Sequence, residues 1–148
     1  MYLQIVKQVT MEKKIYIGFF ENAQGAGSIQ IAADFYGLIE LRKTFLRLSN
    51  GLDSFNFSDL QCLDKKIRIN IVAYADTMNA GLRLSDNGKY EWKVTKEKWA
   101  EFSDNLLLMF EIFNYIPIHF ESNSKDKKDL QVNFELVEYQ PIQNLAFH

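Results

Sequence analysis

The chain has 148 residues, 47% of them hydrophobic and 24% charged, and its 17 basic and 19 acidic residues leave a formal net charge of −2. This balance speaks against a generally cationic nucleic-acid-binding protein, and the lone Cys62 excludes an intrachain disulfide framework. No segment approaches the ~20 apolar residues of a membrane span and the first residues show no leader pattern, so we expect a cytoplasmic protein without membrane contact.

Alternating apolar residues in the first half of the chain predict four strands around one helix. The strands are expected at residues 13–21, 28–32, 54–58 and 63–76. Residues 35–49 are expected to form the helix, because Asp34 can cap its free amide groups and Asn50-Gly51 is typical of a C-terminal end. Its apolar stripe, spaced at three or four residues, consists of Leu38, Leu41, Phe45 and Leu48.

The second half predicts a hairpin, a second helix and two further strands. Asn87-Gly88 joins the alternating strands of residues 81–94, since this pair tolerates the positive backbone angles of a tight turn. Thr95 can cap a helix over residues 96–113. The apolar stripe of that helix consists of Trp99, Phe102, Leu106, Met109 and Phe113. Strands are expected at residues 115–122 and 130–139.

The two halves follow a similar order of elements. "KKIYIGFF" at residues 13–20 and "KKIRINIV" at residues 65–72 share a Lys-Lys-Ile start, and each precedes a strand, a capped helix and a strand. We therefore predict one α+β domain over residues 1–148, with about nine mostly antiparallel strands and two helices. An internally duplicated β-β-α-β unit and a chance repetition of a common pattern both remain open. So does the choice between one curved sheet and two packed sheets.

Few residues could carry catalysis. His119 and Glu121 share one face of a predicted strand, so a small hydrolase could use them as an oriented imidazole, although a solvent-facing pair is the simpler interpretation. Cys62 lies among leucines and acidic residues, which favours packing over a nucleophilic role. The sequence has no phosphate-binding glycine motif, His/Cys cluster or acidic calcium loop. We therefore expect no enzyme activity, no cofactor and no metal.

Binding of single-stranded nucleic acid is another alternative. The strand starts carry the basic residues Lys13, Lys14, Lys65, Lys66 and Arg68. They could follow a phosphate backbone while Tyr16 and Tyr74 stack on bases, in a manner similar to proteins of the Whirly type. Because Glu12 and Asp64 precede the two lysine pairs, and because lysines at strand ends commonly aid solubility, we rank nucleic acid below a protein as the partner.

The outer face of the second helix is the more informative surface. On a helical wheel, four carboxylates and one leucine share a sector opposite the apolar stripe: Glu97, Glu101, Asp104, Leu108 and Glu111. The loop at residues 51–64 adds Asp53, Asp59 and Asp64 without a basic residue between them. A leucine surrounded by carboxylates resembles an interface anchor with a steering rim. A solvated acidic face that pairs with Lys43 and Arg47 of the first helix is the simpler alternative.

One run of the sequence resembles a known family. "GSIQIAADFYGLIELRKTFLRLSNGLDSFNFSD", followed by "KKIRINIV", is similar to the strand-helix-strand pattern of small immunity proteins from bacterial polymorphic-toxin and contact-dependent inhibition systems. The resemblance covers residues 27–72 and includes a Gly-Leu pair near the start of a leucine-rich helix. It implies a cytoplasmic, non-enzymatic inhibitor that occludes a cognate protein toxin, often a basic nuclease, through a complementary acidic surface. It implies no catalytic residues.

Overall fold

The computed structural model describes residues 14–21, 25, 27–112, 118–120 and 130–137. In chain order the elements are β1 (Ile15–Glu21), β2 (Gly27–Ala33), α2 (Phe35–Ser49), β3 (Ser54–Asn56), the 3-10 helix η1 (Phe57–Asp59), β4 (Ile71–Asp76), β5 (Gly81–Leu84), β6 (Tyr90–Thr95), α3 (Lys96–Ile112), β7 (Ile118–Phe120) and β8 (Gln131–Leu136). No helix in the described part of the chain is long and apolar enough to cross a membrane.

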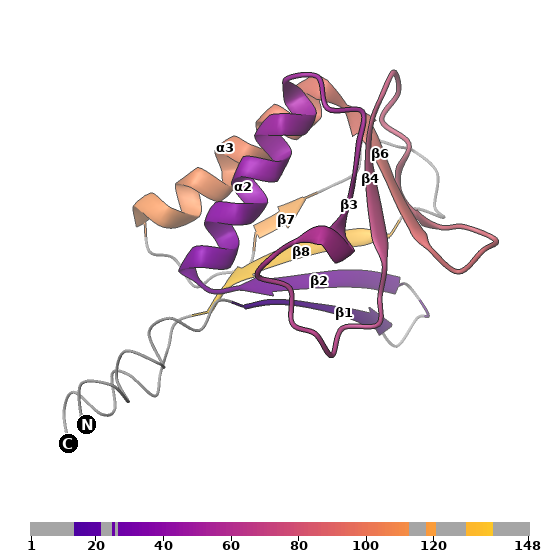
Figure 1. The fold of residues 1–148 in the computed structure, drawn as a ribbon, viewed down its shortest axis with the longest axis horizontal. Coiled ribbons are helices and arrows are strands. Elements are labelled where there is room, and N and C mark those ends of the chain that lie inside the picture. Colours follow the sequence, from indigo (N-terminus) through magenta and orange to yellow (C-terminus); the bar gives the residue numbers. More distant parts are fainter. Residues whose placement is uncertain (1–13, 22–24, 26, 113–117, 121–129, 138–148) are drawn as a thin grey trace.

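The strands form two four-stranded sheets, with the orders β1-β2-β8-β7 and β3-β4-β6-β5. In each sheet the two central strands run parallel and each outer strand pairs antiparallel with its neighbour. The strands of the two sheets run in different directions, and α2 and α3 lie side by side in the corner between them (Figure 1). The predicted α+β class with two helices is confirmed; the described residues hold eight strands, one fewer than expected.

The topology contains an internal two-fold repeat. The first half, β1-β2-α2-β3-β4, corresponds element by element to β5-β6-α3-β7-β8. The strand pairs β1-β2 and β7-β8 form the first sheet, and their counterparts β5-β6 and β3-β4 form the second. Each half of the chain therefore contributes one antiparallel pair to each sheet. The repeated unit is therefore β-β-α-β-β, one strand longer than predicted. The counterpart of β1 is β5, so the two Lys-Lys-Ile runs, which begin β1 and precede β4, are not equivalent.

Residues 64–70 do not extend β4 as the alternation predicts. The Asp64 carboxylate accepts the N–H of Lys66 at 2.8 Å, and the Asp64 C=O accepts the N–H of Ile67 at 3.1 Å, so a local turn replaces extended backbone. The same segment bonds to the start of β1: Ile15 donates to the C=O of Cys62 at 2.6 Å and accepts the N–H of Asp64 at 2.9 Å. These bonds cover the beginning of an otherwise open sheet edge.

Local capping places both helices where the sequence predicts them. Asp34 Oδ1 accepts the N–H of Gly37 at 2.8 Å, and Thr95 Oγ1 accepts the N–H of Lys98 at 3.2 Å. Gly37 also allows α2 to approach β1, because a Cβ there would lie 2.7 Å from the Lys14 C=O oxygen. The glycine of the Gly-Leu pair thus has a packing role.

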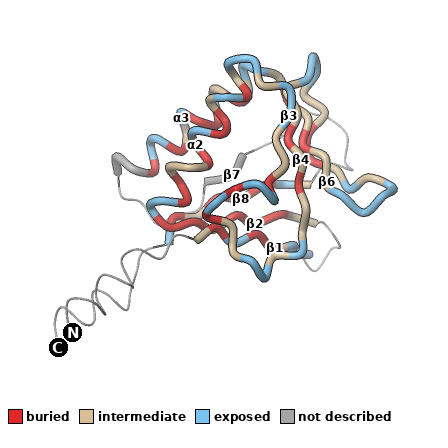
Figure 2. The backbone as a smooth tube through the Cα atoms, in the orientation of Figure 1, coloured by how far each residue is buried: buried red, intermediate tan, exposed pale blue. Residues whose placement is uncertain are grey.

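The core is a cluster of aromatic rings around Phe45 of α2. The Phe45 ring centroid lies 5.1 Å from that of Trp99 on α3, 5.9 Å from that of Trp92 on β6 and 5.9 Å from that of Phe134 on β8. Both helices and both sheets therefore share one core. Figure 2 shows the buried residues along the sides of the helices and sheets that face one another. This packing leaves the outer faces of α2 and α3 free to carry function.

Candidate protein-binding surface

The outer side of α3 carries the acidic residues that the helical wheel predicts. Glu97, Glu101 and Asp104 are exposed, and the Leu108 side chain is 50% exposed. The buried stripe on the opposite side contains Trp99, Phe102, Leu106 and Met109. The side chain of Glu111, as well as Phe113, falls outside the described residues. Leu108 is thus an apolar side chain available for contact, with carboxylates before it on the same helix.

The acidic loop is less uniform than its sequence suggests. Asp53 and Asp59 are exposed. The Asp64 side chain is only 13% exposed; its carboxylate lies 3.9 Å from Lys14 Nζ and accepts the N–H of Lys66. Asp64 therefore shapes the turn that precedes β4 and is less accessible to a partner than the other two aspartates.

Helix α2 separates the two predicted acidic surfaces. One side of α2 lines a groove with residues 55–62, and another side lines a hollow with Leu107 of α3. The exposed surface of α2 carries Lys43 and Arg47, neither of which makes a salt bridge within the described residues. The alternative in which these cations neutralise the acidic face of α3 is therefore not observed there. Glu101 instead pairs with Lys98 on its own helix, at 3.0 Å.

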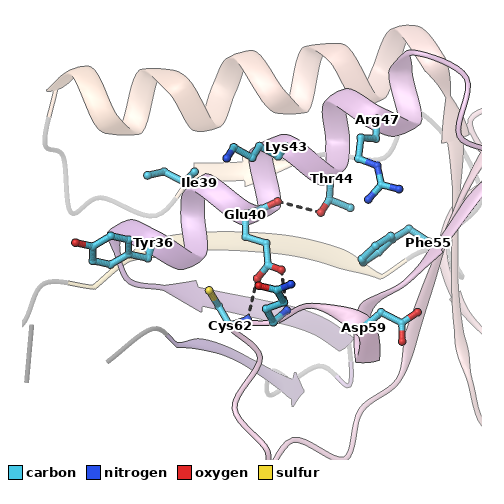
Figure 3. A pocket seen from close by; sticks show the side chains of 10 residues that line it. Tyr36, Ile39, Glu40, Lys43, Thr44, Arg47, Phe55, Asp59 and Cys62 are labelled. Carbon is cyan, nitrogen blue, oxygen red and sulfur yellow. Dashed lines mark hydrogen bonds between the residues drawn. The ribbon is translucent and has the colours of Figure 1, made fainter. Parts of the chain in front are cut away.

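The groove beside α2 has a volume of about 450 Å³ (Figure 3). The Glu40 carboxylate accepts the N–H groups of Gln61 and Cys62 at 2.7 and 2.8 Å, so it fastens the loop to the helix. The Arg47 guanidinium lies 5.9 Å from the Phe55 ring centroid, a cation–π distance. The Glu40 carboxylate already accepts two backbone hydrogen bonds, so it is engaged in holding the loop. The groove is therefore better suited to binding another molecule than to acid-base catalysis.

The residues proposed for nucleic-acid binding come together only in part: Lys14, Lys65 and Lys66 line one pocket, whereas the two tyrosines belong to different sheets. Tyr16 is exposed on β1 of one sheet, whereas Tyr74 belongs to β4 of the other and has Lys93 Nζ 5.6 Å from its ring centroid. Lys65 and Lys66 are exposed in the loop before β4. Lys13 lies outside the described residues. The two tyrosines therefore do not form one stacking platform.

The residues proposed for a hydrolase are only partly described. His119 lies on β7, where its Cα pairs in register with that of Asn133. Glu121 falls outside the described residues, so the predicted His-Glu pair stays a prediction. Cys62 is 6% exposed and belongs to the core, in accord with a packing role. Within the described ranges, no three His, Cys, Asp or Glu side chains are placed to hold a metal ion.

Comparison with models of known protein families, with characterised proteins and with solved structures found no significant match. The sequence-based resemblance to immunity proteins therefore stays a hypothesis.

Three side chains of this surface were missed by sequence reasoning. Glu40 was overlooked because its partners are backbone amides 21 and 22 residues away, which no local pattern indicates. Arg42 and Leu107 were overlooked because they meet only when α2 and α3 pack together. The sequence held one signal for Leu107. It directly precedes Leu108, and because consecutive helical residues point in different directions, Leu107 could have been expected to lie beside the acidic face and not on it.

Proposed function

We propose that this chain is a non-enzymatic binding protein that inhibits a partner protein, and specifically an immunity protein that neutralises a cognate bacterial toxin. The outer face of α3 would cover the active surface of the toxin. Leu108 is the apolar anchor, and Glu97, Glu101, Asp104 and Glu111 are the carboxylates that steer a basic partner toward it. Asp53 and Asp59 form a second, separate acidic surface.

The exposure of Leu108 is the observation that carries this proposal. Leu106 and Met109, its neighbours toward the core, are fully buried, so the core does not need Leu108. A half-exposed leucine with Glu101 and Asp104 on the same helix face has the composition of a small interface centre with a charged rim. The sequence resemblance over residues 27–72 supplies the class of partner.

Co-expression tests the proposal. The gene next to the one that encodes this chain is co-expressed with it, and the proteins are purified through a tag on one of them. Our proposal predicts a stoichiometric complex and a neighbour that is toxic when expressed alone. Leu108→Arg should abolish co-purification, whereas Leu84→Arg should not, because Leu84 is 58% exposed on β5, an edge strand of the second sheet, and does not belong to α3.

Two results would oppose the proposal. A neighbour that is harmless and does not co-purify removes the toxin partner. Equal complex formation by the Leu108→Arg variant and the wild type removes the α3 face as the binding surface. Both variants must show wild-type unfolding midpoints, since a destabilised Leu108→Arg protein would indicate that Leu108 belongs to the core.

A further inference from the structure

A hollow of about 250 Å³ lies at the seam between α2 and α3. Four of its lining residues come from one side of α2 and one from α3: Phe35, Ile39, Arg42, Lys43 and Leu107. Phe35 is 43% exposed and Leu107 is 37% exposed, so apolar surface reaches solvent at its mouth. Small-molecule sites usually enclose roughly 300–1,000 Å³, so this hollow suits one side chain better than a whole ligand.

Arg42 gives the hollow a specific chemistry. Its Nε is buried, and it has no hydrogen-bond partner in the described part of the chain. Arg42 makes no salt bridge with any described residue, and a guanidinium pairs best with a planar carboxylate. Lys43 adds a second positive charge at the same wall, also without a salt bridge to any described residue. The hollow thus combines aliphatic surface with unneutralised positive charge.

We propose that this hollow binds an aliphatic side chain of a partner protein together with an adjacent carboxylate, which Arg42 and Lys43 receive. Charge complementarity selects the occupant, because an apolar side chain alone would leave the positive charges of Arg42 and Lys43 unpaired and a cation would be repelled. The inference deepens the proposed function and rests on it. Leu107 borders the hollow and Leu108 lies on the acidic face, so consecutive residues of α3 would serve two parts of one interface.

The partner surface implied by this arrangement is mixed in charge. Basic groups would face Glu101 and Asp104 of α3, and a carboxylate beside a leucine-like side chain would face α2. Such a pattern of opposite charges attracts the partner and also sets the orientation in which it binds, because a rotated partner would place like charges next to each other.

A fragment titration tests the hollow without the partner. The protein, labelled for methyl and arginine side-chain NMR, is titrated with N-acetyl-L-leucine, with the neutral N-acetyl-L-leucinamide and with octanoate. The acid should shift the Ile39 and Leu107 methyl signals and the Arg42 Nε–H signal in a saturable manner. It should bind about fivefold tighter than the amide, because charge-assisted hydrogen bonds are roughly twice as strong as neutral ones.

Matched variants assign the effect to Arg42. Arg42→Gln should remove the preference for the acid, and the more exposed Lys43→Gln should reduce it without affecting folding. Arg68→Gln, the same substitution on an exposed residue of the loop before β4, should retain it. Equal binding of acid and amide, absence of shifts at Ile39 and Leu107, or the same loss in Arg68→Gln would overturn the inference. Tighter binding of octanoate would assign the hollow to an acyl chain and also overturn it. Because no partner is used, these outcomes are independent of the co-purification result.

Discussion

Glu40→Ala is expected to detach the loop at residues 57–64 from α2. The Glu40 carboxylate accepts two backbone hydrogen bonds, from Gln61 at 2.7 Å and from Cys62 at 2.8 Å. Hydrogen bonds to a charged group contribute about 1.5–3 kcal/mol each; the bond from Cys62 is partly buried and falls near the lower end, whereas the bond from Gln61 is exposed and contributes about 1 kcal/mol. We therefore expect a loss of about 2–3 kcal/mol in the free energy of unfolding.

The expected loss is large enough to measure by two methods. For a chain of this length, 1 kcal/mol corresponds to roughly 2–4 °C in Tm, so the midpoint should fall by about 4–12 °C. Glu40→Gln should lose about half as much, because its amide oxygen can still accept one of the two N–H groups. Amide hydrogen exchange at Gln61 and Cys62 should accelerate in both variants.

The control for this prediction is Glu101→Ala. Glu101 is exposed and pairs only with Lys98 of its own helix in the described structure, so its loss should cost no more than about 0.5 kcal/mol. If Glu40→Ala loses as little as Glu101→Ala and leaves exchange at Gln61 and Cys62 unchanged, the loop is held by other contacts and the reasoning is wrong.

Three further substitutions test the packing. Phe45→Ala removes the central ring of the aromatic core and should cost about 3–5 kcal/mol in urea unfolding; a loss under 1 kcal/mol would mean that the core can close around the cavity. Gly37→Ala should lower Tm clearly, since the new Cβ would lie 2.7 Å from the Lys14 C=O oxygen, and an unchanged Tm would show that α2 can shift. Trp99→Phe loses the 3.0 Å bond from Nε1 to the Tyr74 C=O and should cost about 1–3 kcal/mol by denaturant titration; stability equal to the wild type would mean that another donor replaces it.

Helix positions were predictable because their signals are local. The expected range 35–49 agrees with α2 at both ends, and the described part of α3, Lys96–Ile112, lies within the expected range 96–113. Asp34 and Thr95 mark the starts through bonds to amides three residues away, a separation that the sequence shows directly.

Strand pairing depends on contacts that the sequence does not display. The alternation at residues 63–76 predicts one long strand, but Asp64 bonds within its own segment and forms a turn. The parallel pairing of β2 with β8 joins residues more than 100 positions apart, with Ile29 in register with Val132, so the division into two sheets could not be foreseen. The Lys-Lys-Ile repetition predicted a repeat that the topology does contain, but it paired β1 with β4, whereas the counterpart of β1 is β5.

The candidate surface was predictable to the extent that it belongs to one helix. The wheel placed Leu108 among exposed carboxylates, and the structure shows it 50% exposed. The wheel could not show that Asp64 is engaged by Lys14, that Lys43 and Arg47 make no salt bridge with described residues, or that Arg42 meets Leu107. Each of these facts requires knowing which elements pack together.

The affinity of the co-purified partner for the Leu108→Arg and Leu84→Arg variants tests the central claim most directly. We expect calorimetry to show at least about a thirtyfold loss of affinity for Leu108→Arg, because an anchor at the centre of an interface contributes about 2–4 kcal/mol or more. Affinity should be within twofold of the wild type for Leu84→Arg, with equal unfolding midpoints for all three proteins. Equal affinities for the two variants, or a loss confined to Leu84→Arg, would contradict the assignment of α3 as the binding face.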